Sequence, residues 1–197
     1  ACLTAATLAA LADLLSRQGD RRVAVQSLAG TGLVLLALFL AAEGRQQGRL
    51  PNTAQDVLAW VALGSVGVHL AVIAGLRIRA LGPFLLPVAA ACALLAPLAG
   101  PRPWATPGVP QGPWGLVHGL AALAGQTAFA LAFAAGALYL IQARRLKTDP
   151  ARISRLPDLE TLDRLNLGAL LAALPCWTLS LVAGALQAQA VWGTDWM

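Results

Sequence analysis

The sequence predicts an all-α membrane protein, a polytopic bundle of about six transmembrane helices. Of the 197 residues, 58% are hydrophobic and 12% are charged, and the mean hydropathy is +0.68. Soluble domains carry about 25% charged residues, so this chain has too little polar surface to cover a globule in water. The apolar residues also come in blocks of about 20, the length that crosses a bilayer core of roughly 30 Å.

The apolar blocks cover residues 1–15, 23–42, 57–76, 81–99, 114–141 and 167–191. The first block is short and begins without Met, and the last runs directly into the end of the chain. We therefore expect residues 1–197 to form a single transmembrane domain that is a fragment of a longer chain, truncated at both ends. No basic stretch precedes the first block, which argues against a signal peptide.

Two of the predicted spans contain an internal proline, Pro87 in the fourth and Pro175 in the sixth. Each proline removes one backbone hydrogen bond, so we expect both helices to kink. Leucines recur at every third residue of segment 156–165, between charged side chains. This pattern predicts a short amphipathic helix before the last span.

The loops between the blocks differ in basic charge. Eleven of the 14 Lys and Arg residues fall in one set of alternate loops, and the other set holds Arg45, Arg49 and Arg102. The positive-inside rule assigns the first set to the cytoplasm. Both ends of this chain then lie on the outer side of the plasma or inner membrane. Most of the tryptophans also fall at outer helix ends. Two explanations stay open: an aromatic belt, or an outer site that uses the indole surfaces.

Few side chains in the sequence can carry chemistry. The three cysteines lie in separate apolar blocks without a CxxC pair, which is typical of packing residues. The carboxylates lie at membrane edges or in loops, which argues against a proton-coupled transporter. We predict no catalytic residue. No nucleic-acid motif accompanies the net charge of +5.

The two histidines are the most informative residues. His118 lies at the outer mouth of the fifth span, above Ala121, Ala122 and Gly125 on the same helix face. Two interpretations stay open: a metal ligand beside a shelf for a flat macrocycle, or a hydrogen-bonding histidine at a helix contact. His69 lies deeper in the third span. It is either a packing residue bonded to a backbone carbonyl or an intramembrane functional group.

Several motifs follow one another in an order that resembles a known family. They are GRLP at 48–51, RIRALGPFLLP at 77–87, WGLVH at 114–118, LYLIQ at 138–142 and LPDLETLDRLN at 156–166, followed by the last span and Trp192-Gly193. Together they resemble the integral membrane proteins of the cytochrome c assembly family, of the CcsA/HemX type.

The resemblance implies a heme cofactor and a set of site residues. It makes His118 a ligand of the heme iron, and it matches Trp192, Gly193 and Trp196 to the start of the family's outer tryptophan-rich, heme-binding segment. Asp195 departs from that segment, which usually has Tyr there. We expect the rest of the segment and two further histidines to follow Met197.

The resemblance also implies a function: heme handling at the outer face of the membrane during c-type cytochrome assembly. The chain would be at most part of a heme-delivery or cytochrome c synthase system, with other membrane subunits and apocytochrome c as partners. One alternative is a structural subunit or anchor of a larger membrane complex. Another is a HemX-like regulator of heme biosynthesis that binds a cytoplasmic enzyme through the basic loop 142–166.

Fusions of a topology reporter test the orientation. A reporter at Pro107 is expected in the outer compartment and one at Pro150 in the cytoplasm, because of the Lys and Arg distribution. Alkaline phosphatase and fluorescent-protein fusions measure the two sides independently. Reversed signals at both positions would contradict the orientation.

Overall fold

Five helices form the regular elements of the computed structural model, which describes residues 22–47, 53–76, 78, 80–100, 112–148 and 157–193. They are α2 (Arg22–Gln47), α3 (Ala54–Leu76), α4 (Gly82–Ala99), α5 (Pro113–Thr148) and α6 (Leu159–Trp192). All five are long and apolar enough to cross a membrane. The predicted class, an all-α multi-pass membrane protein, is confirmed. The predicted first block, residues 1–15, lies outside the described residues, so a sixth span stays a prediction.

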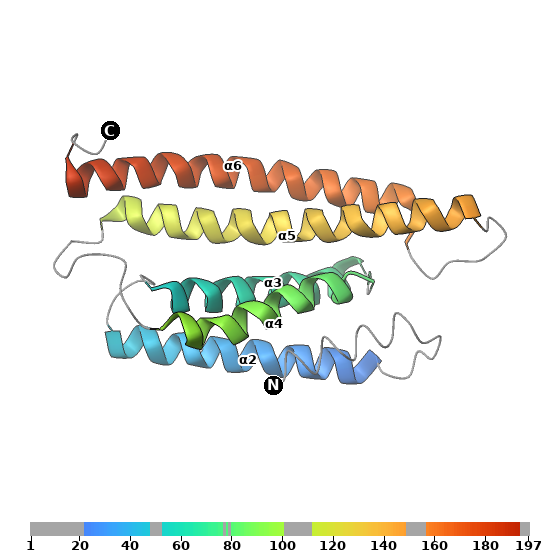
Figure 1. Ribbon diagram of the computed structural model, residues 1–197, viewed down its shortest axis with the longest axis horizontal. Helices are drawn as coiled ribbons and strands as arrows, with labels where there is room; N and C mark the ends of the chain where they lie inside the picture. The colour runs from blue at the N-terminus through green and yellow to red at the C-terminus, as the bar shows by residue number, and fades with distance from the viewer. Residues whose placement is uncertain are drawn as a thin grey trace.

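Successive helices run in opposite directions (Figure 1). α6 packs on one side of α5, the pair of α3 and α4 lies on the other side of α5, and α2 covers the far side of that pair. One end of the bundle, called here the Gly193 end, collects the ends of α2, α4 and α6 and the starts of α3 and α5. The opposite end is called the Asp158 end. Arg144, Arg145, Lys147 and Arg164 belong to the Asp158 end, and Arg45 belongs to the Gly193 end.

Small residues make the helix contacts. Ala29, Ala62 and Ala89 join α2, α3 and α4 in one buried cluster. A second buried cluster joins α3, α4, α5 and α6 through Ala134 and Leu162, among others. Lipid tails are as apolar as leucine, so helices in a bilayer associate through close van der Waals packing that small residues allow. Large side chains accordingly face outward: Leu98 is 81% exposed and Leu171 is 64% exposed, among many others.

Local capping fixes where α3 and α6 begin. Before α3, the Thr53 N–H donates to Asp56 Oδ2 at 3.2 Å, and the Asp56 N–H donates to Thr53 Oγ1 at 3.0 Å. This reciprocal pair is a capping box and satisfies two amides at the helix start. Asp158 caps α6 by accepting the Thr161 N–H at 3.2 Å. Hydrogen bonds from the Thr161 side chain and backbone lower the pKa of Asp158.

The predicted amphipathic helix is not separate from the last span. Residues 159–165 form the first two turns of α6, and Leu162 among them is fully buried in the cluster that joins α6 to α5. α4 continues through Pro87 and α6 through Pro175. Bends at these two prolines stay predictions.

The contact between α5 and α6 is built around a glycine. A Cβ at Gly125 of α5 would lie 2.5 Å from Cδ1 of Trp177 on α6. The indole of Trp177 also packs against the Phe129 ring, with 6.3 Å between the ring centroids. Only a residue without a side chain lets the two helices approach this closely around so large a ring.

Gly125→Ala is expected to destabilise the α5–α6 pair by about 1–3 kcal/mol, because the added methyl overpacks the site against Trp177. Thermal unfolding in detergent, followed by near-UV circular dichroism, measures the effect. Gly119→Ala on the same helix is the control, since a Cβ there meets nothing within 4 Å. Equal melting temperatures for the two variants would contradict the close contact.

Candidate functional site

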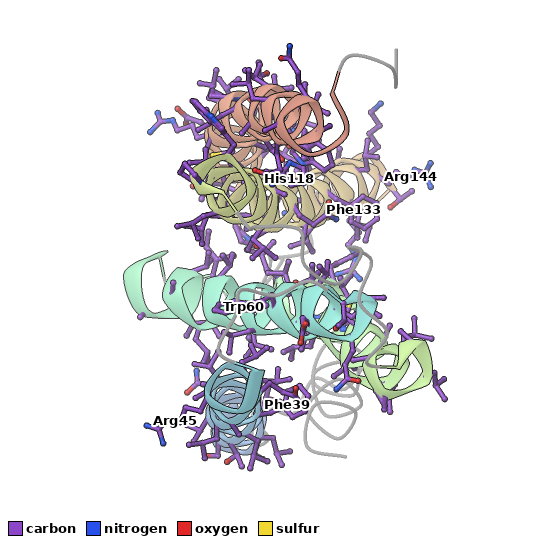
Figure 2. The ribbon with its side chains drawn as sticks, turned by 90° about the vertical axis from the view of Figure 1, so that its left-hand side faces the viewer. Phe39, Arg45, Trp60, His118, Phe133 and Arg144 are labelled. Atoms are coloured by element: carbon purple, nitrogen blue, oxygen red, sulfur yellow. The ribbon has the colours of Figure 1, made fainter. Side chains whose placement is uncertain are left out.

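His118 lies between the α5 and α6 ribbons, in the part of the pair near the Gly193 end (Figure 2). Its side chain is exposed overall, but one edge of the ring is held by α6. The Nδ1 atom lies 2.8 Å from the carbonyl oxygen of Ser180 and 3.1 Å from the Ser180 hydroxyl oxygen. The histidine therefore joins the helix contact with one nitrogen and leaves the rest of its ring accessible.

These bonds define the tautomer of the His118 ring. A backbone carbonyl can only accept a hydrogen bond, so Nδ1 must carry the proton that it donates to Ser180. The Ser180 hydroxyl donates its own proton to the His118 carbonyl at 3.1 Å, so its oxygen also faces Nδ1 as an acceptor. In the neutral ring the lone pair then resides on Nε2, the nitrogen that is free to bind a metal.

The shelf predicted below His118 is filled by protein. The Trp177 indole lies over Gly125, and Ala121 is 8% exposed. The small residues serve the close approach of α6, which is the packing use of the pattern. A macrocycle bound at His118 has to lie on the exposed side of the ring instead. Trp114 lies one turn before His118 on α5 and is 44% exposed.

The predicted tryptophan segment begins at the same end of the same helix pair. Trp192 is the last residue of α6, and Gly193 ends the helix with φ 73° while its N–H donates to the Gln189 carbonyl at 3.0 Å. Glycine adopts this positive φ at little cost, which lets the chain leave the helix axis. The Trp192 side chain and all of Trp196 lie outside the part of the chain that the structure describes.

Three residues of α6 at this contact were not identified from the sequence: Ser180, Gly184 and Gln187. Gln187 Oε1 accepts the N–H of Gly115 at 3.1 Å, close to the start of α5. The spacing Ser180-x-x-x-Gly184 is the small-xxx-small pattern of close helix contacts, and Gln187 follows on the same face. That signal is present in the sequence, but it does not reveal which side chain of α5 lies opposite.

His69 lacks the hydrogen bond that was expected of it as a packing residue. It is 1% exposed in the middle of α3, and neither ring nitrogen has a hydrogen-bond partner among the described residues. The hydroxyl of Ser65, one turn earlier on α3, is likewise buried without a partner in this part of the structure. The expected bond from His69 to a neighbouring backbone carbonyl is therefore not made.

The accessible histidine of this contact can supply one ligand to a metal. Among the described residues no group of three or more His, Cys, Asp and Glu side chains is placed to hold a metal. A porphyrin supplies four nitrogen ligands of its own, so heme iron needs only an axial ligand from the protein. One accessible histidine with a fixed tautomer meets that requirement.

Comparison with known proteins gives one match. No curated protein and no solved structure matches the chain. Residues 50–197 match the family described as cytochrome C assembly protein. That range covers more than half of the chain, including the four helices α3 to α6 and His118. The chain therefore belongs to the cytochrome c assembly protein family.

Proposed function

We propose that this protein handles heme at the outer face of the membrane during c-type cytochrome assembly, with His118 as an axial ligand of the iron. The observation that supports this most directly is the bond from His118 Nδ1 to the Ser180 carbonyl. Histidines that bind metals usually donate their second ring N–H to such an acceptor, which orients the ring and fixes its tautomer. Family membership supports the role in cytochrome c biogenesis.

Bound heme would supply the iron that His118 would ligate and the group that is joined to the cytochrome. The residues of this chain would hold the heme and orient it. Nε2 of His118 presents its lone pair outward, while Ser180 and the α5–α6 contact hold the ring. Trp192 and Trp196 are proposed to cover a porphyrin face, since large indole surfaces exclude water from an apolar ligand.

Heme propionates need cationic partners, and we assign this role to Arg49 and Arg102. Arg45, the third basic residue of the outer loops, is exposed in the last turn of α2, on the opposite side of the α3–α4 pair from His118 (Figure 2), so it is not placed to reach a heme bound there. Guanidinium groups bind carboxylates through two parallel hydrogen bonds. Other membrane subunits and an apocytochrome are the proposed partners of the outer site.

One observation favours the structural-subunit alternative. Trp177 packs directly against Gly125, so this face of α5 serves the contact with α6 and is not open to a ligand. In such a subunit His118 would be an interfacial histidine that ties α5 to α6. The regulator alternative draws on the exposed basic residues Arg144, Arg145 and Lys147 at the end of α5.

The visible spectrum of the purified protein tests the proposal. The full-length protein, expressed with ample heme, is expected to carry a Soret band that His118→Ala weakens by at least about tenfold in occupancy, because an axial bond is lost. His69→Ala is the matched control, since it removes the other histidine and is expected to leave the band unchanged.

Three outcomes separate the alternatives. Absence of a Soret band from the full-length protein would contradict heme handling and favour the structural subunit or the regulator. A band that is lost with His69→Ala but kept with His118→Ala would move the ligand into the membrane. A band that survives His118→Ala but is lost when the protein is truncated at Met197 would assign the decisive ligands to a later segment.

Trp192→Ala tests the second half of the proposed site. The variant is expected to keep the Soret position while heme dissociates about ten times faster, since the axial bond remains and about 1.4 kcal/mol of apolar cover is lost. Transfer of heme to apomyoglobin measures the rate. An unchanged rate would remove Trp192 from the site.

A further inference from the structure

The acceptor that holds His118 is unusual because it belongs to the interior of a helix. Within α6 the Ser180 carbonyl accepts the backbone N–H four residues later, as in any α-helix. A carbonyl oxygen has two lone pairs, so one acceptor position remains. In most helices the side chain four residues later shields that position from a neighbouring helix.

At this position of α6 the shield is missing, because residue 184 is glycine. A Cβ built on Gly184 would lie 2.8 Å from Nδ1 and 3.1 Å from Cε1 of His118. Real Cβ atoms do not approach other atoms this closely, so any residue but glycine displaces the imidazole. The ring thus occupies the space that a side chain would fill, and it reaches the second lone pair of the Ser180 carbonyl.

We propose that Ser180 and Gly184 are positioning residues that form a notch in α6, and that this notch selects the Nδ1–H tautomer of His118. The notch supplies only acceptors to Nδ1: the Ser180 carbonyl, and the Ser180 hydroxyl oxygen whose proton is committed to the His118 carbonyl. The other tautomer would bring the Nδ1 lone pair against these oxygens. Selection of the tautomer follows from the helix contact and does not require a ligand.

The consequence for heme rests on the proposed function. A proton fixed on Nδ1 makes Nε2 the ligating atom, and the bond to the carbonyl fixes the orientation of the ring. Loss of such a partner typically costs about 10–100-fold in metal affinity. Ser180 and Gly184 would therefore affect the strength of the bond between His118 Nε2 and the iron, although they contact the opposite edge of the imidazole.

Nuclear magnetic resonance of 15N-labelled histidine tests the tautomer directly. The sequence holds two histidines, so His69→Ala gives a background in which His118 is the one imidazole of this region. In a neutral imidazole the protonated and the unprotonated nitrogen differ strongly in 15N shift. The parent is expected to show the Nδ1–H form without heme.

Two variants and a matched control complete the experiment. Gly184→Ala is expected to give a mixture of tautomers, and Ser180→Ala, which keeps the carbonyl, a smaller change. Gly168→Ala on the same helix, where a Cβ meets nothing within 4 Å, is expected to match the parent. With heme added, Gly184→Ala is expected to bind about 10–100-fold more weakly than Gly168→Ala.

The results distinguish this inference from the proposed function. An Nε2–H ring in the parent, or Gly184→Ala spectra identical to those of the parent, would overturn the notch even if heme binds. An Nδ1–H ring that depends on Gly184 in a protein without a Soret band would support the notch and reject the heme site.

Discussion

The closeness of α5 to α6 is the constraint on which the rest of the proposed site depends. Two glycines permit it, each facing a ring from the other helix: Gly125 faces Trp177, and Gly184 faces His118. Each helix thus supplies one glycine and one ring, and the ring of each helix packs over the glycine of the other. In a bilayer, where water does not drive helices together, this mutual fit supplies the dispersion contacts that hold the pair.

The same geometry explains why His118 can be both a packing residue and a ligand. Its Nδ1 edge belongs to the helix contact, while the remainder of the ring is exposed. The packing interpretation therefore describes the Nδ1 edge of the ring, and the proposed ligand role would use the exposed edge. Among the described helices, α6 packs extensively only on α5. The His118 ring is therefore held by α6 without being enclosed by the other helices.

Hydropathy predicted the class and five of the helices well, because burial in lipid demands long apolar segments. The Trp114–Val191 region was divided correctly into two spans, but the start of α6 was misjudged. The charged residues between Leu159, Leu162 and Leu165 give a pattern typical of a surface helix. In the structure this segment is the start of α6, and Leu162 is buried in the cluster shared with α5. Which residues lie opposite across a contact depends on helix rotation and axial offset. A single sequence encodes neither openly, so Ser180 and Gly184 emerged only from the structure.

The continuity of α6 has a mechanical consequence. Its 34 residues make a rod of about 51 Å at 1.5 Å per residue, with the acidic cap Asp158 at one end and Gly193 at the other. Backbone hydrogen bonds make such a rod stiff along its axis, so an axial displacement applied at Asp158 reaches Gly193 almost undiminished. Sideways force would act differently if α6 bends at Pro175 as predicted, because the proline lacks the N–H that would complete the hydrogen-bond ladder there. An axial displacement of α6 at Asp158 would thus carry the helix end at Gly193 with it, whereas a tilt of the Asp158 end would be absorbed at such a bend.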